Sequence, residues 1–168
     1  MTLKDFTLTD NNNFVAYQSH SFFFKRIYLV LITKNYLIGL VCNNNLNTEN
    51  NDKVLVNQQM RKELPKGGSL LNPYSYLKAK FIRKIEGKYF FDKSIYAVDA
   101  GNFRIDRNDI QSAIHDDKEV PLGNYPNGGT LSLETKKGLK KDFILVGKQN
   151  GKEVVASILT RDKDAFLN

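Results

Sequence analysis

The order of apolar and polar positions in the second half of the chain predicts a series of strands. Leu131 and Leu133 alternate with polar neighbours, which is the two-residue period of a strand with one buried face. Residues 143–146 follow as an apolar run of strand length. Residues 103–106 and 109–115 flank an Asp-Arg-Asn-Asp turn and predict two further strands. Their expected inward anchors are Ile105, Ile110 and Ile114.

The C-terminal segment predicts an amphipathic helix. Asn150 can cap its first turn, and Glu153 follows three residues later. Asn150-Gly151 is also a hairpin signal, but a strand here would bury a poorer set of side chains. Apolar residues recur at helical spacing and are expected to face the sheets: Val154, Val155, Ile158, Leu159 and Phe166.

The clearest hairpin lies in the first third of the chain. Residues 22–33 and 36–43 are rich in β-branched and aromatic side chains, and Lys34-Asn35 joins them. Residues 1–20 are polar and rich in Asn, with scattered apolar residues. They predict an irregular arm or one short edge element.

An inserted segment, residues 45–88, follows the hairpin. Residues 52–64 predict a short helix that ends at Pro65. Residues 73–86 carry an apolar stripe at helical spacing with Pro at the first position, but Lys78 interrupts the stripe and a strand also stays open. Residues 89–98 predict a strand.

Taken in order, these elements resemble the bacterial pleckstrin-homology-like domains, relatives of the pleckstrin-homology and GRAM folds. The residues that carry the resemblance are 26–42, 103–110, 129–133, 142–146 and the helix from Gly151. The resemblance implies a mainly β domain of two near-orthogonal antiparallel sheets, capped by the C-terminal amphipathic helix, here with a helical insertion in the first half. It also implies a recognition module that binds lipid headgroups, peptides or protein partners.

Composition is consistent with a single domain over residues 1–168, because 41% of the residues are hydrophobic and suffice for an ordinary core. Cys42 is the only cysteine, so an internal disulfide is excluded and a reducing compartment is expected. The N-terminus lacks the order of a signal peptide. The most apolar window, residues 22–42, holds Lys25, Arg26 and Lys34, which argues against a membrane span. We expect a cytoplasmic protein that can associate with a membrane periphery.

The net charge of +7 is unevenly distributed along the chain. Residues 73–101 hold six Lys or Arg and three Asp or Glu, which gives +3. Two groups are candidates for binding an anionic surface, and the second is expected to act as an additional contact for the first. The first group is Lys78, Lys80, Arg83, Lys84 and Lys88, and the second is Lys136, Lys137, Lys140 and Lys141.

Three interpretations of these cations stay open. A solvated helix face or a biased codon usage explains them without any function. A functional interpretation predicts a protein partner or an anionic membrane surface. Because basic residues alternate with Tyr74, Tyr76, Phe81 and Tyr89, the alternative is a nucleic-acid-binding module.

Residues able to perform chemistry are sparse. His115 is followed by Asp116 and Asp117, but three adjacent residues do not easily converge on one metal ion. Cys42 has no His at a recognisable spacing, and the Gly128-Gly129 pair lacks the Lys of a phosphate-binding loop. The sequence therefore predicts a binding protein without catalytic residues, cofactor or metal ion. A deep pocket at His115 would favour an enzyme instead.

Overall fold

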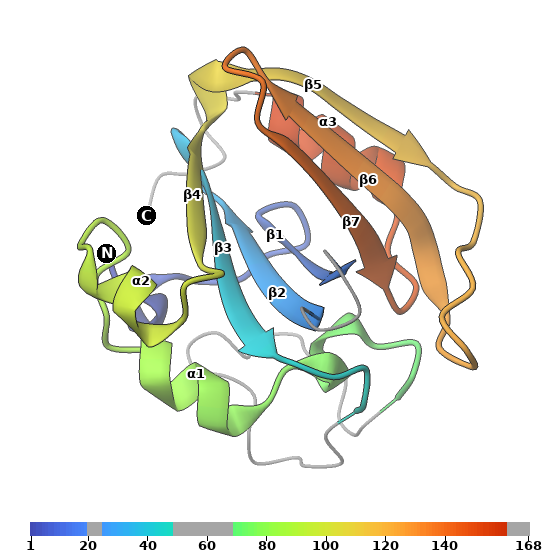
Figure 1. The fold of residues 1–168 in the computed structure, drawn as a ribbon, viewed down its shortest axis with the longest axis horizontal. Helices are drawn as coiled ribbons and strands as arrows, with labels where there is room; N and C mark the ends of the chain where they lie inside the picture. The colour runs from blue at the N-terminus through green and yellow to red at the C-terminus, as the bar shows by residue number, and fades with distance from the viewer. Residues whose placement is uncertain (20–24, 49–68, 161–168) are drawn as a thin grey trace.

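The computed structural model describes residues 1–19, 25–48 and 69–160, and its main feature is one antiparallel sheet of seven strands (Figure 1). The sheet is curled into a half-barrel, with the strand order β4-β3-β2-β1-β7-β6-β5. The strands are β1 Asn13–Ser19, β2 Lys25–Ile32, β3 Tyr36–Asn43, β4 Phe103–Asp106, β5 Ile110–Asp116, β6 Asn127–Thr135 and β7 Lys140–Val146. The described α-helices are α1 Ala79–Ile85, α2 Ser94–Val98 and α3 Gly151–Leu159, and the 3-10 turns are η1 Leu3–Asp5, η3 Pro73–Tyr76 and η4 Arg107–Asp109.

Strand β1 occupies the middle of the sheet, where the sequence predicted an irregular arm or an edge element. It pairs with β2 along its whole length, and with β7 at Ala16↔Leu145 and Tyr17↔Ile144. Phe14, Val15, Ala16 and Tyr17 are all buried, because elements cover both faces of this strand. A strand covered on both faces loses its alternation of apolar and polar residues, so its pattern does not stand out.

The β1–β7 pairing makes the sheet continuous. Two separate near-orthogonal sheets were expected, whereas hydrogen bonding runs through all seven strands. The class is mainly β, as predicted. The hairpin of β2 and β3 also agrees with the prediction within the described residues.

The two faces of the sheet carry separate apolar cores. The inner core joins strands from both halves of the half-barrel, for example Phe14 of β1 with Phe143 of β7. α3 packs against β5 and β6 and adds Ile158 to this core. The outer core lies on the other face of β1–β3, which the N-terminal segment, η3 and α1 cover with Leu3, Phe6, Tyr76, Ile82 and Ile85.

The segment that the sequence left open between helix and strand is helical. Asn72 accepts a hydrogen bond from the Tyr74 N–H, and Pro73 takes the first position of η3. The chain is extended at Leu77 and Lys78 before α1 begins. The helix expected over residues 52–64 and the residue Phe166 lie outside the described residues.

Two predictions in the second half were wrong. Residues 89–98 contain α2 instead of a strand, since only Phe90 and Ile95 among them are buried and no alternation exists to hold them on a sheet. Ile114 was expected to face inward but is exposed. A register irregularity between Ile110 and Ser112 places Ala113 in the inner core in its stead.

Candidate anionic-surface interface

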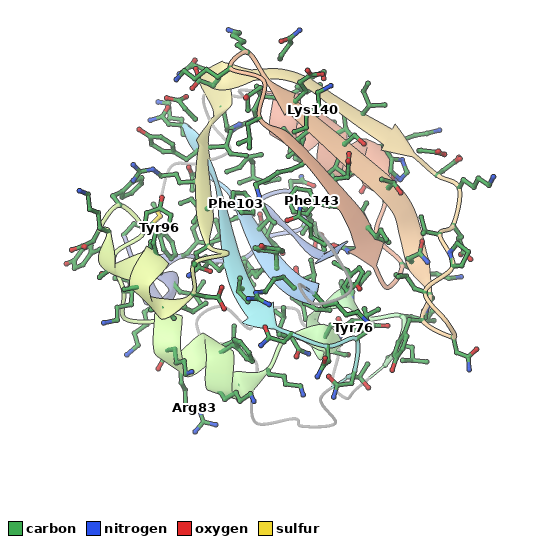
Figure 2. All side chains as sticks on the ribbon, viewed as in Figure 1. Tyr76, Arg83, Tyr96, Phe103, Lys140 and Phe143 are labelled. Carbon is green, nitrogen blue, oxygen red and sulfur yellow. The ribbon has the colours of Figure 1, made fainter. Side chains whose placement is uncertain are left out.

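Helix α1 presents the first group of candidate cations. Ala79, Ile82 and Ile85 are buried, and this apolar stripe fixes the helix against β3. The cations of the opposite side therefore point into solvent, as Arg83 does in Figure 2. We call this surface the basic face and define it as Lys78, Lys80, Arg83, Lys84 and Lys88, of which all but Lys78 are exposed.

The basic face is electrostatically uncompensated. Within the described part of the chain, none of its five cations has a carboxylate oxygen within 4.0 Å. The Nζ atoms of Lys80 and Lys84 lie 5.4 and 6.0 Å from the centroid of the Phe81 ring. Arg83 and Lys84 also stand in the last turn, where a cation interacts favourably with the helix dipole.

The second group of cations differs, because two of its members already form ion pairs with carboxylates. Lys137 Nζ lies 2.7 Å from Asp109 Oδ2, and this hydrogen bond raises the pKa of Lys137. Lys140 Nζ lies 3.4 Å from Glu134 Oε1. The two carboxylates therefore neutralise most of the positive charge that Lys137 and Lys140 could offer to an external anion.

Lys141 is half-buried, and burial lowers the pKa of its ammonium group. Its Nζ lies over the Phe103 ring, 4.3 Å from the centroid, and 6.0 Å from the centroid of Phe143. Lys136, by contrast, is exposed. Within the second group, Lys136 is thus the exposed cation without an ion pair to another described residue.

The two groups lie far apart. Figure 2 shows Lys140 at the end of the molecule opposite to Arg83. That the turn at 136–141 adds a contact to the basic face stays a prediction.

Aromatic side chains that alternate with the cations are mostly turned inward. Tyr76 is buried, and its hydroxyl donates to the Leu70 carbonyl at 3.1 Å. The Tyr74 hydroxyl donates to Asn13 Oδ1 at 2.6 Å, and burial raises the pKa of Tyr74. Only Tyr89 of the four, at 62% exposure, presents most of its ring to solvent, and Phe81 is half-buried. The aromatic pattern that suggested nucleic-acid stacking is largely a packing pattern.

Other exposed aromatic residues follow α1, and sequence reasoning missed them. Phe91 is 48% exposed, and its ring lies edge-on to Tyr36, with the centroids 5.4 Å apart. The Arg104 guanidinium carbon lies 5.2 Å from the Tyr36 centroid and 5.4 Å from that of Phe91. Since Phe91 belonged to a predicted strand, nothing in the sequence indicated this cluster.

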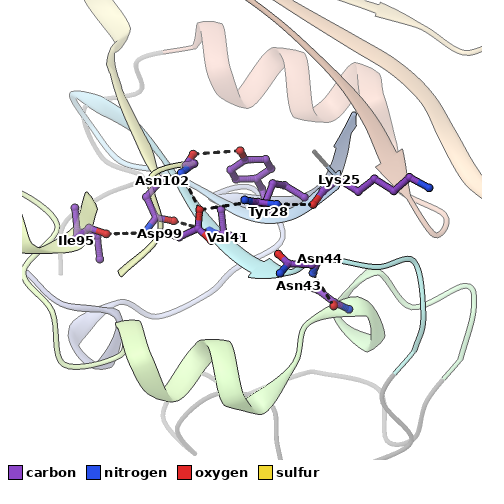
Figure 3. A network of polar contacts seen from close by, with 10 residues as sticks. Lys25, Tyr28, Val41, Asn43, Asn44, Ile95, Asp99 and Asn102 are labelled. Carbon is purple, nitrogen blue, oxygen red and sulfur yellow. Dashed lines mark hydrogen bonds and ion pairs between the residues drawn. The ribbon is translucent and has the colours of Figure 1, made fainter. Parts of the chain in front are cut away.

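A buried polar network fixes α2 and the start of β4 relative to the sheet (Figure 3). Asn102 Oδ1 accepts the Val41 N–H, and Asn102 Nδ2 donates to the Ile95 carbonyl, both at 2.7 Å. The Tyr28 hydroxyl donates to the Gly101 carbonyl at 3.1 Å. Asp99 completes the network, because its Oδ1 accepts the Gly101 N–H and lies 3.5 Å from Arg26 Nε.

The residues tested for chemistry have structural roles. His115 Nε2 contacts the Gly128 carbonyl at 2.6 Å, and the His115 ring lies where a Cβ on Gly151 would be. Asp116 Oδ1 accepts the Lys118 N–H instead of approaching the imidazole. No group of three or more His, Cys, Asp or Glu suited to a metal ion occurs among the described residues. Cys42 is fully buried, which raises its thiol pKa to about 12.

Comparison of the chain with known protein families, with curated proteins and with solved structures found no match. Among the helices of the described residues, none has the length and apolar character needed to cross a membrane.

Proposed function

We propose that this protein is a non-enzymatic recognition domain of pleckstrin-homology-like fold, and that its basic face docks on an anionic membrane surface. The observation that carries the proposal is the group of exposed cations on and beside α1 for which the described residues supply no carboxylate. Such a group keeps its full attraction for an external anionic surface.

Two features support the pleckstrin-homology-like assignment. The last strand, β7, returns to pair with β1 in a sheet of seven strands. α3 then follows β7 directly and packs on β5 and β6, with Ile158 in the inner core. A C-terminal helix that closes a curled sheet is what the sequence resemblance implies.

The composition of the basic face favours a lipid surface over a protein groove. Four of its five cations are Lys, a residue that is depleted in protein interfaces. Lys carries a flexible point charge that suits a diffuse array of headgroups. Nucleic acid remains the second candidate, but the inward positions of Tyr74 and Tyr76 remove two of the rings that would stack on bases.

The expected affinity is low. Five cations less the one carboxylate of the segment, Glu86, leave a net charge of +4. Near an anionic membrane each charge contributes roughly 1 kcal/mol, so about 4 kcal/mol is available and the dissociation constant is on the order of 1 mM. A second contact with a protein partner is therefore needed for stable attachment.

The test is co-sedimentation with phosphatidylserine-rich vesicles at low and at physiological salt. We expect salt-sensitive binding, which the combined substitution Lys80→Glu, Arg83→Glu and Lys84→Glu abolishes without unfolding the domain. A matched control carries the same change of net charge on other exposed lysines, Lys118→Glu, Lys148→Glu and Lys152→Glu, and keeps most of the binding.

Two results would contradict the proposal. If the protein does not sediment with the vesicles even at low salt, the membrane is not its partner. Equal losses in the two triple variants would show that net charge, and not the basic face, causes the attraction. Tighter binding to single-stranded nucleic acid than to vesicles would favour the second candidate.

A further inference from the structure

A second surface, distinct in composition from the basic face, surrounds Arg104. The guanidinium of Arg104 lies over the rings of Tyr36 and Phe91, at 5.2 and 5.4 Å from their centroids. We call these three residues the aromatic–arginine cluster. Contact with two rings restricts the rotation of the guanidinium.

Three separate segments build this cluster and hold it in place. Ile38 of β3 pairs with Arg104 of β4, which puts Tyr36 two residues further along the neighbouring strand. Phe91 comes from the connection between α1 and α2. The Asn102 hydrogen bonds to Val41 and Ile95 hold α2, the element that follows this connection, against the sheet.

In the described part of the chain, the N–H groups of the Arg104 guanidinium have no hydrogen-bond acceptor. No carboxylate oxygen there lies within 4.0 Å of it. The acidic neighbours in sequence are engaged elsewhere, since Asp106 Oδ1 accepts the Asn108 N–H at 2.8 Å and Asp92 Oδ1 accepts the Ser94 N–H at 2.7 Å. Two parallel N–H groups of a planar guanidinium match the spacing of the two oxygens of a carboxylate.

The surroundings of Arg104 resemble the centre of a protein interface. Phe91 is 48% exposed within the cluster. Tyr, Phe and Arg are the residues enriched where binding energy concentrates, whereas the basic face is mainly Lys. Arg104 and Phe91 thus offer one positive charge next to apolar contact area.

We propose that the aromatic–arginine cluster binds a carboxylate of an Asp or Glu side chain in a partner protein, flanked by an apolar residue that packs on Phe91. A single guanidinium carries one positive charge, which matches a carboxylate. Sites for phosphorylated segments are instead built from clusters of arginines. This surface does not depend on membrane docking by the basic face.

The experiment screens the full chain against an array of short peptides with a central Asp or Glu and all residue types at the flanking positions. A matched array carries Asn or Gln at the centre. We expect the protein to select carboxylate peptides with an aromatic or aliphatic neighbour. Arg104→Gln weakens binding to the selected peptides about tenfold or more, since a charge-assisted bidentate pair is lost. Arg104→Lys restores little of the peptide binding, because an ammonium group cannot donate two parallel hydrogen bonds to one carboxylate.

Controls separate the cluster from general charge and from the basic face. Lys118→Gln removes one charge elsewhere and keeps peptide binding, and Arg104→Gln keeps its melting temperature and its sedimentation with vesicles. Equal selection from both arrays, unchanged peptide binding in Arg104→Gln, or a loss of vesicle binding in Arg104→Gln would each overturn the proposal. A larger shift of the Arg104 Nε–H resonance with inorganic phosphate than with a selected peptide would overturn the choice of a carboxylate.

Discussion

At the scale of single residues, Arg107 in η4 connects parts of the chain that are distant in sequence. Its side chain is only 4% exposed. Nη2 donates to the carbonyls of Ser157, Ile158 and Thr160 at 2.6–2.8 Å, and Nη1 donates to the Thr33 carbonyl at 2.8 Å. The carbonyls of Ser157, Ile158 and Thr160 lie in the last turn of α3 or directly after it. Carbonyls at this end of a helix have no intrahelical donor, and the helix dipole favours a positive charge there.

We therefore predict that Arg107→Ala lowers the free energy of unfolding by about 3 kcal/mol, because it leaves several buried carbonyls without donors. Arg107→Lys recovers only part of this loss, since an ammonium group cannot reach carbonyls from α3 and the β2–β3 turn together. Urea denaturation followed by circular dichroism measures both variants. A change of less than about 0.5 kcal/mol in Arg107→Ala would contradict this role.

The residue scale is also where sequence reasoning had least to work with. Arg107 was read as part of a turn, because its partners in the β2–β3 turn and at the end of α3 lie at least 50 residues away in sequence. Arg104 and Phe91 come together for the same reason, through the β3–β4 pairing and the Asn102 network. Long-range contacts of single polar or aromatic side chains leave no periodic trace in a sequence.

At the scale of elements, α3 agrees with its prediction in position and in most of its apolar face, but Leu159 faces solvent. Asn150 Oδ1 accepts the N–H groups of Lys152 and Glu153, as a capping residue does. Of the apolar residues expected to face the sheet, Ile158 is 2% exposed, whereas Leu159 is 51% exposed. Val154 and Val155 are partly buried and pack against the inner core with Ile158, whereas Leu159 lies outside this contact.

Two substitutions at adjacent positions test which side of α3 faces the sheet. We predict that Ile158→Asp removes a core side chain and buries an unpaired charge, for a loss of about 2–5 kcal/mol or more. The total stability of a domain is about 5–15 kcal/mol, so this variant is close to unfolding. Leu159→Asp costs less than about 1 kcal/mol, because its side chain stays in solvent. Thermal melting separates the two, and equal losses would contradict the observed orientation of α3.

Elements with one buried face could be predicted, and elements covered on both faces could not. β6 has buried Leu131 and Leu133, and the alternation of these residues identified the strand. β1, with Phe14 to Tyr17 buried throughout, was taken for an irregular arm. The prediction failed because the insertion packs on the outer face of β1. This face therefore carries apolar residues, whereas a strand exposed on one face would carry polar ones there.

At the scale of the whole molecule, burial of titratable groups in the two cores links folding to alkaline pH. Burial raises the pKa of Cys42 from 9.0 to about 12 and that of Tyr28 from 10.0 to about 12. Cys42 belongs to the outer core and Tyr28 to the inner core. Each group keeps its proton in the folded state at a pH at which the unfolded chain has already lost it.

The sign of the effect follows from proton binding. Between about pH 9 and pH 12 the unfolded chain binds fewer protons than the folded protein, so the free energy of unfolding falls as the pH rises. The stabilisation is complete below pH 9 and is lost toward pH 12. We therefore predict a melting temperature that decreases steadily above pH 9, with one cooperative transition because the sheet is continuous.

The contribution of Cys42 can be isolated by comparing the protein with Cys42→Ala over the same pH range. At pH 11 the thiol alone accounts for roughly 2–3 kcal/mol of the decrease, since each unit of pKa difference corresponds to 1.36 kcal/mol. Cys42→Ala leaves a cavity and lowers stability at pH 8, but its further loss between pH 8 and pH 11 is smaller by that amount. Parallel pH profiles for the two proteins would show that the Cys42 thiol titrates alike in the folded and unfolded states, against its complete burial in the outer core.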